Sequence, residues 1–294
     1  MTAIRDRDDT PLFSVCELTT LALPLERELK LYVEAGIDGI GICEVKLPDD
    51  HDNELVTAVE RSGLRAGICL PATLSVLPLP KFAGPSDPQE RIEALISGIR
   101  RLAPFRPACV FCLTGPQGEL ETGEARQIIV NGLRRVAQVA DEVGVRLGLE
   151  AIHASIRDGW TIVSSIPEVL ELLDEVSADN LGIGFDVWHL WDTPNLLADI
   201  RAHADRIVGV HVNDWRQPTR GWNDRVLPGD GVIDLASIFA ALEDGGYDGW
   251  YDLEILSDDG TWEDDYEDSL WKLPPGEVLR RGREGFLEAW ARRR

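Results

Sequence analysis

The sequence contains no apolar run long enough for a membrane span, which needs about 18 to 20 consecutive apolar residues. Its first ten residues, MTAIRDRDDT, lack the hydrophobic core of a secretory signal. Basic residues are also scarce, because 29 Lys and Arg stand against 52 Asp and Glu, which gives a formal net charge of −23. Such a charge repels phosphate backbones and anionic lipid surfaces. We therefore expect a soluble, cytoplasmic protein that binds neither nucleic acid nor membranes.

Cysteine is scarce as well, and no disulfide is expected. All five cysteines fall in apolar runs that are expected to be strands, and an odd number without a signal peptide indicates reduced, buried thiols. The last two form a C-x-x-C pair, but a spacing of three along a strand places their side chains on opposite faces. A redox or zinc role is therefore not expected for that pair. The five are Cys16, Cys43, Cys69, Cys109 and Cys112.

Glycine-rich phosphate loops are absent. Neither GIDGIG at 36–41 nor TGPQGE at 114–119 has the form G-x-G-x-x-G or ends in Gly-Lys-Ser/Thr. These glycines are expected to end a helix and to form a turn. An open doubly wound sheet, the alternative fold, would need such a loop after an early strand, so this absence counts against it.

The sequence does contain a regular alternation of short apolar runs and amphipathic segments. Strands are expected at 12–16, 37–45, 64–70, 108–113, 145–150, 181–186, 207–212 and 250–255. Helices are expected at 24–35, 51–62, 88–102, 124–143, 167–176, 195–204 and 234–245.

This alternation predicts a closed parallel barrel. A chain of 294 residues with 44% hydrophobic content suits one barrel of about 250 residues with extensions. The predicted fold class is α/β, a (β/α)8 TIM barrel, in a single domain over 1–294 with 1–10 frayed. The proline-rich loop at 71–87 is expected on the active-site side. The acidic run at 257–271 is expected to be a solvated loop, with a second cation site as the alternative.

Four of the later apolar runs carry a carboxylate or an imidazole near their carboxyl ends. A polar side chain that interrupts a buried strand costs desolvation free energy, and barrel active sites are built where strands meet the loops that follow them. Two Glu, one Asp and one His suit Mn²⁺, Mg²⁺ or Co²⁺ better than a structural zinc, which favours thiolates. The alternative is four unrelated polar residues held by backbone hydrogen bonds. The four are Glu150, Asp186, His211 and Glu254.

These residues and their motifs resemble the xylose isomerase-like sugar phosphate isomerase/epimerase superfamily. The motifs are EAIH, DVWH, HVNDW and DRVLPGDGVIDL, and the resemblance extends from about Phe13 to Glu254. The superfamily includes D-tagatose 3-epimerase, hydroxypyruvate isomerase, inosose dehydratase and the endonuclease IV relatives. The endonuclease branch is disfavoured, because its three-metal site uses more histidines than the five present and the chain is acidic.

The resemblance implies one divalent cation, with Mn²⁺ favoured, bound by the four residues above. The cation would hold two neighbouring sugar oxygens and stabilise an enediolate. In the epimerase relatives two glutamates face opposite sides of the substrate, which implies that Glu150 and Glu254 remove and return the proton. No organic cofactor is expected.

The resemblance also implies contacts to the substrate. His189 is expected to reach a substrate oxygen or to orient a ligand, with a satisfied loop histidine as the alternative. Arg225, just before the turn VLPGDG, is expected to contact the substrate and metal-bound groups and to face an enediolate oxygen. The alternative for this arginine is a salt bridge to Asp214, Asp224 or Asp230.

Further substrate contacts are expected from His153, Trp188 and Trp215, because tryptophan faces often pack against sugars. For His153, a structural role is an equal alternative. His51 and His203 are interpreted as surface or helix-capping residues.

Three functions follow from this reading. The first is a metal-dependent sugar isomerase or epimerase that transfers a proton next to a carbonyl. The second is a lyase on the same site, either an inosose-type dehydratase or a deglycosidase of 3-oxo sugars. The third, a non-catalytic sugar-binding role, is disfavoured by the complete ligand set. The expected partner is a small sugar or sugar derivative, and the oligomeric state is left open.

Overall fold

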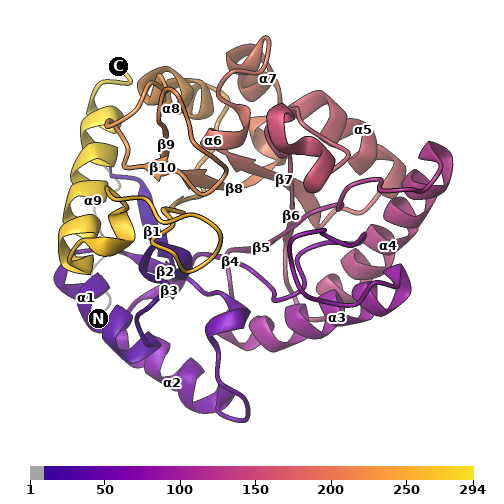
Figure 1. The fold of residues 1–294 in the computed structure, drawn as a ribbon, viewed down its shortest axis with the longest axis horizontal. Helices are drawn as coiled ribbons and strands as arrows, with labels where there is room; N and C mark the ends of the chain where they lie inside the picture. The colour runs from indigo at the N-terminus through magenta and orange to yellow at the C-terminus, as the bar shows by residue number, and fades with distance from the viewer. Residues whose placement is uncertain (1–9) are drawn as a thin grey trace.

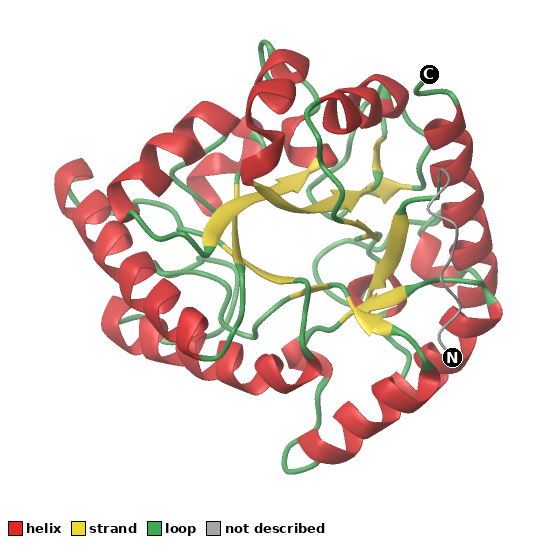
Figure 2. Cartoon of the chain, turned by 180° about the vertical axis from the view of Figure 1, so that it is seen from behind, coloured by secondary structure: helices red, strands yellow, loops and turns green. Residues whose placement is uncertain are grey.

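Parallel strands form a central barrel that helices surround (Figures 1 and 2). The structure is a computed structural model and describes residues 10–294, so the expected fraying of 1–10 lies outside the described residues except at Thr10. The strands are β1 (Leu12–Cys16), β2 (Gly39–Gly41), β3 (Arg65–Ala66), β4 (Ile68–Cys69), β5 (Cys109–Cys112), β6 (Leu147–Glu150), β7 (Leu181–Asp186), β8 (Ile207–Val212), β9 (Asp214–Trp215), β10 (Arg225–Val226) and β11 (Trp250–Leu253). The helices are α1 (Leu25–Glu34), α2 (Asp52–Ser62), α3 (Pro88–Leu102), α4 (Thr122–Glu142), α5 (Ile166–Val176), α6 (Val187–Leu190), α7 (Leu196–His203), α8 (Leu235–Asp244) and α9 (Pro275–Ala291).

One split strand closes the barrel. The sheet runs in the order β3-β2-β1-β11-β8-β7-β6-β5-β4, and its two end strands are separated in the chain only by Gly67. The first half pairs with β2 and the second half with β5, both in parallel. The two ends of the sheet therefore belong to one chain segment, and the predicted (β/α)8 fold is confirmed.

Local sequence explains why the helices form where they do, as α3 illustrates. Asp87 caps its amino end by accepting hydrogen bonds from the main-chain N–H groups of Gln89 and Glu90, and Pro88 occupies the first turn. Helical spacing then puts its apolar residues on one buried face, at Ile92, Leu95, Ile96, Ile99 and Leu102.

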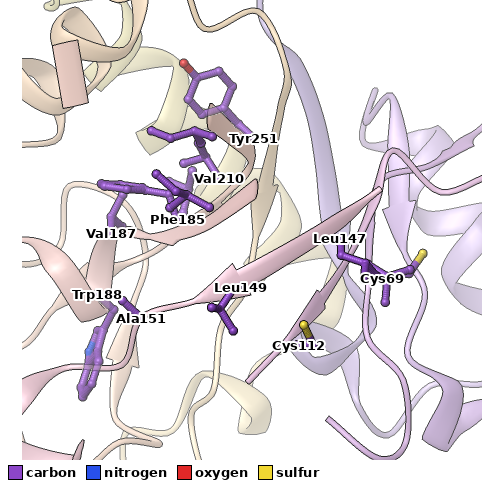
Figure 3. Packing of buried hydrophobic residues seen from close by; sticks show 14 of the residues in the cluster. Cys69, Cys112, Leu147, Leu149, Ala151, Phe185, Val187, Trp188, Val210 and Tyr251 are labelled. Carbon is purple, nitrogen blue, oxygen red and sulfur yellow. The ribbon is translucent and has the colours of Figure 1, made fainter. Parts of the chain in front are cut away.

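These faces meet the outer side of the sheet in one large core. Figure 3 shows members of this core, among them Leu147 and Leu149 of β6 and Phe185 of β7. Side chains alternate along a strand, so these residues face the helices while their neighbours face the barrel interior. Burial of each such side chain contributes roughly 1.5–3 kcal/mol.

A phenylalanine fills the barrel interior next to a predicted metal ligand. The ring of Phe111 lies 4.6 Å, centroid to centroid, from the imidazole of His211. Gly148 makes room for this ring, since a Cβ there would lie 2.6 Å from Phe111 Cδ1. The absence of a side chain on one strand thus allows a ring from the next strand to support the imidazole.

All five cysteines are buried and free, as predicted. Cys109 packs with Ile68 and Val208, whereas Cys112 belongs to the large core that also contains helix residues. The two thiols of the C-x-x-C pair thus pack in different clusters, which agrees with the predicted opposite faces.

Other features depart from the predictions. The strand expected at 37–45 is reduced to Gly39–Gly41, because the chain then turns through a 3-10 segment at Glu44–Lys46. The short helix α6, the hairpin β9–β10 and the long helix α9 were not predicted.

The acidic run at 257–271 is not simply a solvated loop. Asp258 is buried, and its carboxylate accepts hydrogen bonds from the main-chain N–H groups of Gly260, Trp262, Glu263 and Asp264. These bonds outweigh the effect of burial and lower the pKa of Asp258. The loop is therefore folded around one of its own carboxylates.

None of the helices within residues 10–294 is both long and apolar enough to cross a bilayer.

The packing of Phe111 against Gly148 predicts the effect of a small substitution. Gly148→Ala should lower the free energy of unfolding by about 1–3 kcal/mol, because the added methyl group collides with the ring. Chemical denaturation measures this change. Gly123→Ala in α4 is the matched control, since nothing lies within 4 Å of a Cβ there, and it should not destabilise the protein. Equal stability of both variants would contradict this account of the interior.

Candidate metal centre

The four predicted ligands lie at the carboxyl ends of four neighbouring strands. Glu150 and Asp186 end β6 and β7, His211 lies one residue before the end of β8, and Glu254 directly follows β11. These strands are consecutive in the sheet. Side chains that point inward from consecutive strand ends converge at one mouth of the barrel.

The structure brings these side chains together. One donor atom each from Glu150, Asp186 and His211 lies within 4.8 Å of the others. His211 Nδ1 is 3.5 Å from Glu150 Oε1 and 3.4 Å from Glu254 Oε2. Three of the predicted ligands thus form a compact group, and Glu254 joins it through the imidazole.

Arg225 contacts two of the predicted ligands. Its Nη1 donates to Asp186 Oδ2 at 2.7 Å and to Glu254 Oε2 at 2.5 Å, and its side chain is buried. The alternative partners considered from the sequence were nearby aspartates, and the structure shows different ones. The guanidinium therefore lies against the predicted ligands themselves.

The clustered charges shift the acidity of the site. Burial raises the pKa of Glu150 to about 7, although nearby His211 lowers it. Burial alone would lower the pKa of His211, but the carboxylates, first that of Glu254 and then that of Glu150, raise it to about 9. His211 is therefore protonated at neutral pH when no cation is bound.

These residues fit a divalent cation by charge and by donor type. Four buried or nearly buried carboxylates surround only two cationic groups, Arg225 and protonated His211, which leaves an excess of negative charge. Within residues 10–294, His211 Nδ1 has no hydrogen-bond partner although it is buried and faces carboxylate oxygens. A divalent cation would balance the charge and use that nitrogen. The four carboxylates are those of Glu150, Asp186, Asp252 and Glu254.

The hydrogen bonding of His189 defines where its proton lies. Its Nδ1 accepts a hydrogen bond from the main-chain N–H of His153 at 3.2 Å. Burial and then the charge of Arg225 lower the pKa of His189 well below its usual range, so the ring is neutral. A neutral imidazole that accepts at Nδ1 carries its proton on Nε2. In that tautomer the Nε2–H faces the predicted metal centre, 3.8 Å from Asp186 Oδ2 and 3.3 Å from Arg225 Nη2.

The predicted aromatic contacts are buried beside His153. The rings of Trp188 and Trp215 are 4.4 Å apart, and that of Trp215 lies 4.7 Å from His153. Trp188 is only 1% exposed and Trp215 only 6%, so neither offers an open face in this conformation. His153 also lies 2.7 Å from Ser155 Oγ and 3.3 Å from Asp192. A substrate role for these three residues stays a prediction.

More exposed aromatic rings come from other loops at the same end of the barrel. Phe82 lies 4.9 Å from Trp160 and 5.8 Å from Trp222, which stacks on Trp262 at 5.1 Å. Phe82 belongs to the proline-rich loop at 71–87, for which the active-site side was predicted. An ion pair between Lys81 and Glu263, 2.5 Å long, joins that loop to the acidic run. Long loops thus meet above the strand ends.

Asn213 is a site residue that sequence reasoning did not single out. Its Nδ2 donates to Asp186 Oδ1 at 3.0 Å and to the main-chain oxygen of Glu254 at 3.3 Å. It lies inside the motif HVNDW, and its position two residues after His211 was the available signal. Asn213 holds two ligand segments in place.

The comparisons with known proteins agree on fold. The sequence pattern of the family described as "Xylose isomerase-like TIM barrel" matches residues 29–275. A solved structure of the IolI protein with a bound zinc atom superposes with a TM-score of 0.77 at 20% identity, covering 95% of this chain and 98% of that one. At this identity the likeness shows the fold alone.

Curated relatives are enzymes that act on sugar derivatives. An inosose isomerase from Halalkalibacterium halodurans is 28% identical over 138 residues, 45% of this chain and 47% of the relative. An inosose dehydratase from Geobacillus thermodenitrificans is 27% identical over 47% of this chain and 49% of the relative. An L-ribulose 3-epimerase from Methylomonas sp. is 30% identical over 50% of this chain and 48% of the relative. The match spans about half the length of each.

Loss of any one predicted ligand should weaken cation binding strongly. Glu150→Gln, Asp186→Asn and His211→Ala should each reduce Mn²⁺ affinity by more than about 100-fold. Loss of a residue that only hydrogen-bonds to a metal ligand already lowers metal affinity by about 10- to 100-fold, and loss of a ligand itself should lower it further. Isothermal titration calorimetry measures this, and circular dichroism checks folding. His51→Ala, which changes an exposed imidazole 3.3 Å from Glu54, is the matched control. Wild-type affinity in all three variants would disprove the site.

Cation binding should also depend on pH. Because the pKa of His211 is raised to about 9 in the free protein, a cation must displace its proton at neutral pH. Mn²⁺ affinity should therefore increase by up to about tenfold per pH unit from pH 7 and level off above about pH 9. Calorimetry in buffers of different ionisation enthalpy should show about one proton released at pH 8. Affinity that is constant from pH 7 to 9 would contradict the charge state assigned to His211.

Proposed function

The chain belongs to the xylose isomerase-like TIM barrel family, and we propose that it is a metal-dependent enzyme that isomerises or epimerises a sugar or sugar derivative. The observation that carries this proposal is the convergence of Glu150, Asp186 and His211 donor atoms within 4.8 Å at the mouth of the barrel. The isomerase and epimerase among the relatives support the reaction class.

We propose Mn²⁺ as the cation, because three of the four proposed ligands are carboxylates, and Mn²⁺ suits oxygen donors. Glu150, Asp186, His211 and Glu254 would hold it. When bound, it would polarise a carbonyl or hydroxyl oxygen of the substrate and stabilise the negative charge that develops there.

We propose that two glutamates move protons. Glu150 and Glu254 approach the same nitrogen of His211 from β6 and β11, and these strands are separated in the sheet by β7 and β8. With one carboxylate on each side of a bound sugar, one glutamate would remove the proton from the carbon next to the carbonyl. The other glutamate would deliver a proton to the opposite face of that carbon. With the cation bound, Glu150 would stay ionised and would accept the proton as a general base.

His189 and Arg225 would hold the substrate oxygens. His189 Nε2 and Arg225 Nη2 lie 3.3 Å apart, and both are donors if His189 is neutral with its proton on Nε2. Two adjacent donors need an oxygen acceptor near both of them. A substrate oxygen that gains negative charge during the reaction would meet this need.

A lyase on the same site is the second candidate. The inosose dehydratase among the relatives supports it, and the chemistry begins with the same removal of a proton next to a carbonyl. The reactions then differ, because a lyase expels a leaving group from the neighbouring carbon. His189, as a buried neutral donor, would give such a group a hydrogen bond, and its proton would come from water or another acid.

The proposed roles of the two glutamates can be tested by isotope exchange. Glu150→Gln and Glu254→Gln, each saturated with Mn²⁺ and checked for occupancy, are incubated in D₂O with a panel of ketoses and cyclic keto-polyols. In an epimerase, one variant should still exchange the substrate proton for deuterium but form less than about 1% of the wild-type product, because general acid–base catalysis contributes about 10²- to 10⁴-fold. Mass spectrometry and NMR follow exchange and product together.

The same experiment separates the two candidate reactions. Elimination product formed by one variant at a sizeable fraction of the wild-type rate would favour the lyase. Complete loss of exchange and turnover in both variants despite full metal occupancy would refute the proposal that the two glutamates act on opposite faces of the substrate. Wild-type protein that exchanges no proton from any of these substrates would refute the proposed reaction class for them.

A further inference from the structure

A buried carboxylate lies beside the metal centre and takes no part in the chemistry proposed above. Asp252 belongs to β11, two residues before Glu254, and is fully inaccessible to solvent. Among residues 10–294, neither of its carboxylate oxygens has a hydrogen-bond partner. A buried polar group without a partner costs free energy, about 1–3 kcal/mol and more when it is charged. Its position next to the site therefore needs a reason.

The strand register places Asp252 next to His211. The two residues are direct partners in the parallel pairing of β11 and β8, and Asp186 pairs with His211 on the other side. Paired residues in neighbouring strands point to the same side of the sheet. Asp252, His211 and Asp186 therefore form one inward-facing row across three strands.

Within this row, the two nitrogens of His211 have different neighbours. Nδ1 faces Glu150 and Glu254, at 3.5 Å and 3.4 Å, whereas Nε2 faces Asp252 Oδ2 at 3.9 Å. Nε2 has no hydrogen-bond partner within residues 10–294 either. A small rotation of the imidazole or of the carboxylate would bring these two unpartnered groups into contact.

The barrel makes room for this carboxylate. A Cβ on Gly41 would lie 2.3 Å from Asp252 Oδ2, so only glycine fits there without a shift of the aspartate. On the other side of Asp252 in the register is Ser14 of β1, which is also buried.

We propose that Asp252 is a positioning residue that accepts the Nε2–H of His211 and thereby leaves the Nδ1 lone pair for the divalent cation. The inference rests on the metal site of the proposed function, not on the reaction that the site performs. A metal-bound imidazole generally donates its other N–H to a carboxylate, a carbonyl or water, and this contact fixes the tautomer and the ring orientation. Asp252 supplies that acceptor from the strand next to His211.

Three variants test the role of Asp252. Asp252→Leu removes the acceptor and should weaken Mn²⁺ binding by about 10- to 100-fold. Asp252→Asn keeps an oxygen acceptor without the charge and should retain affinity better than Asp252→Leu by at least about threefold. Tyr251→Phe, the control, removes a buried hydroxyl from the neighbour of Asp252 in β11 that belongs to the large core outside the barrel. It should leave affinity within about twofold of wild type.

Calorimetry with Mn²⁺ and thermal melting without metal separate this role from a structural one. Asp252→Leu affinity within twofold of wild type would overturn the inference. Equal losses in Asp252→Leu and Asp252→Asn would also overturn it, because the negative charge and not the acceptor would then be responsible. If Asp252→Leu does not fold, Asp252→Asn still decides, because a loss of Mn²⁺ affinity of more than about tenfold in this variant, which keeps the acceptor, would overturn the inference.

Long-range ¹H–¹⁵N spectra of the Zn²⁺-loaded protein report the tautomer directly. The wild type and Asp252→Asn should both show His211 protonated at Nε2 and metal-bound at Nδ1. The opposite tautomer in the wild type would overturn the inference, as would a wild-type chain that binds neither Mn²⁺ nor Zn²⁺. Neither measurement depends on turnover, so the absence of isomerase activity would refute the proposed reaction and leave this test intact.

Discussion

The crowding of buried carboxylates at one end of the barrel is the constraint on which the rest of the site depends. Glu150, Asp186 and Glu254 approach one imidazole, and like charges this close cannot all remain ionised without cationic partners. In the free protein the partners are Arg225, which contacts two of the carboxylates, and a proton on His211. A divalent cation would replace the proton and balance the negative charge of these carboxylates.

The pairing register of neighbouring strands brings these side chains together. Asp186, His211 and Asp252 are direct partners in successive parallel pairs, so they must share one inward-facing row. The ring of Phe111 then supports the imidazole from within the barrel. The Asn213 side chain donates a hydrogen bond to Asp186. The main-chain N–H of His153 donates to Nδ1 of His189, which favours the tautomer with the proton on Nε2.

Sequence reasoning predicted the barrel and the four strand-end residues, because an apolar run interrupted by a carboxylate or an imidazole is a local signal. It did not predict the partners of Arg225, since the reach of a long side chain across two strands is set by tertiary packing. It also passed over Asp252, which lies two residues before Glu254 in WYDLEIL and gained no meaning until the register placed it beside His211. Asp258 was read as part of a solvated acidic run, whereas the loop folds around it. Local patterns thus locate the candidate site, and strand pairing and loop contacts determine its geometry.

The four strand-end side chains are proposed to form one cation site. A crystal structure of the protein grown with Mn²⁺, with the ion located by its anomalous scattering, tests this most directly. We expect a single strong peak bounded by Glu150, Asp186, Glu254 and His211 Nδ1. A peak elsewhere, or a cation bound through His211 Nε2, would contradict it.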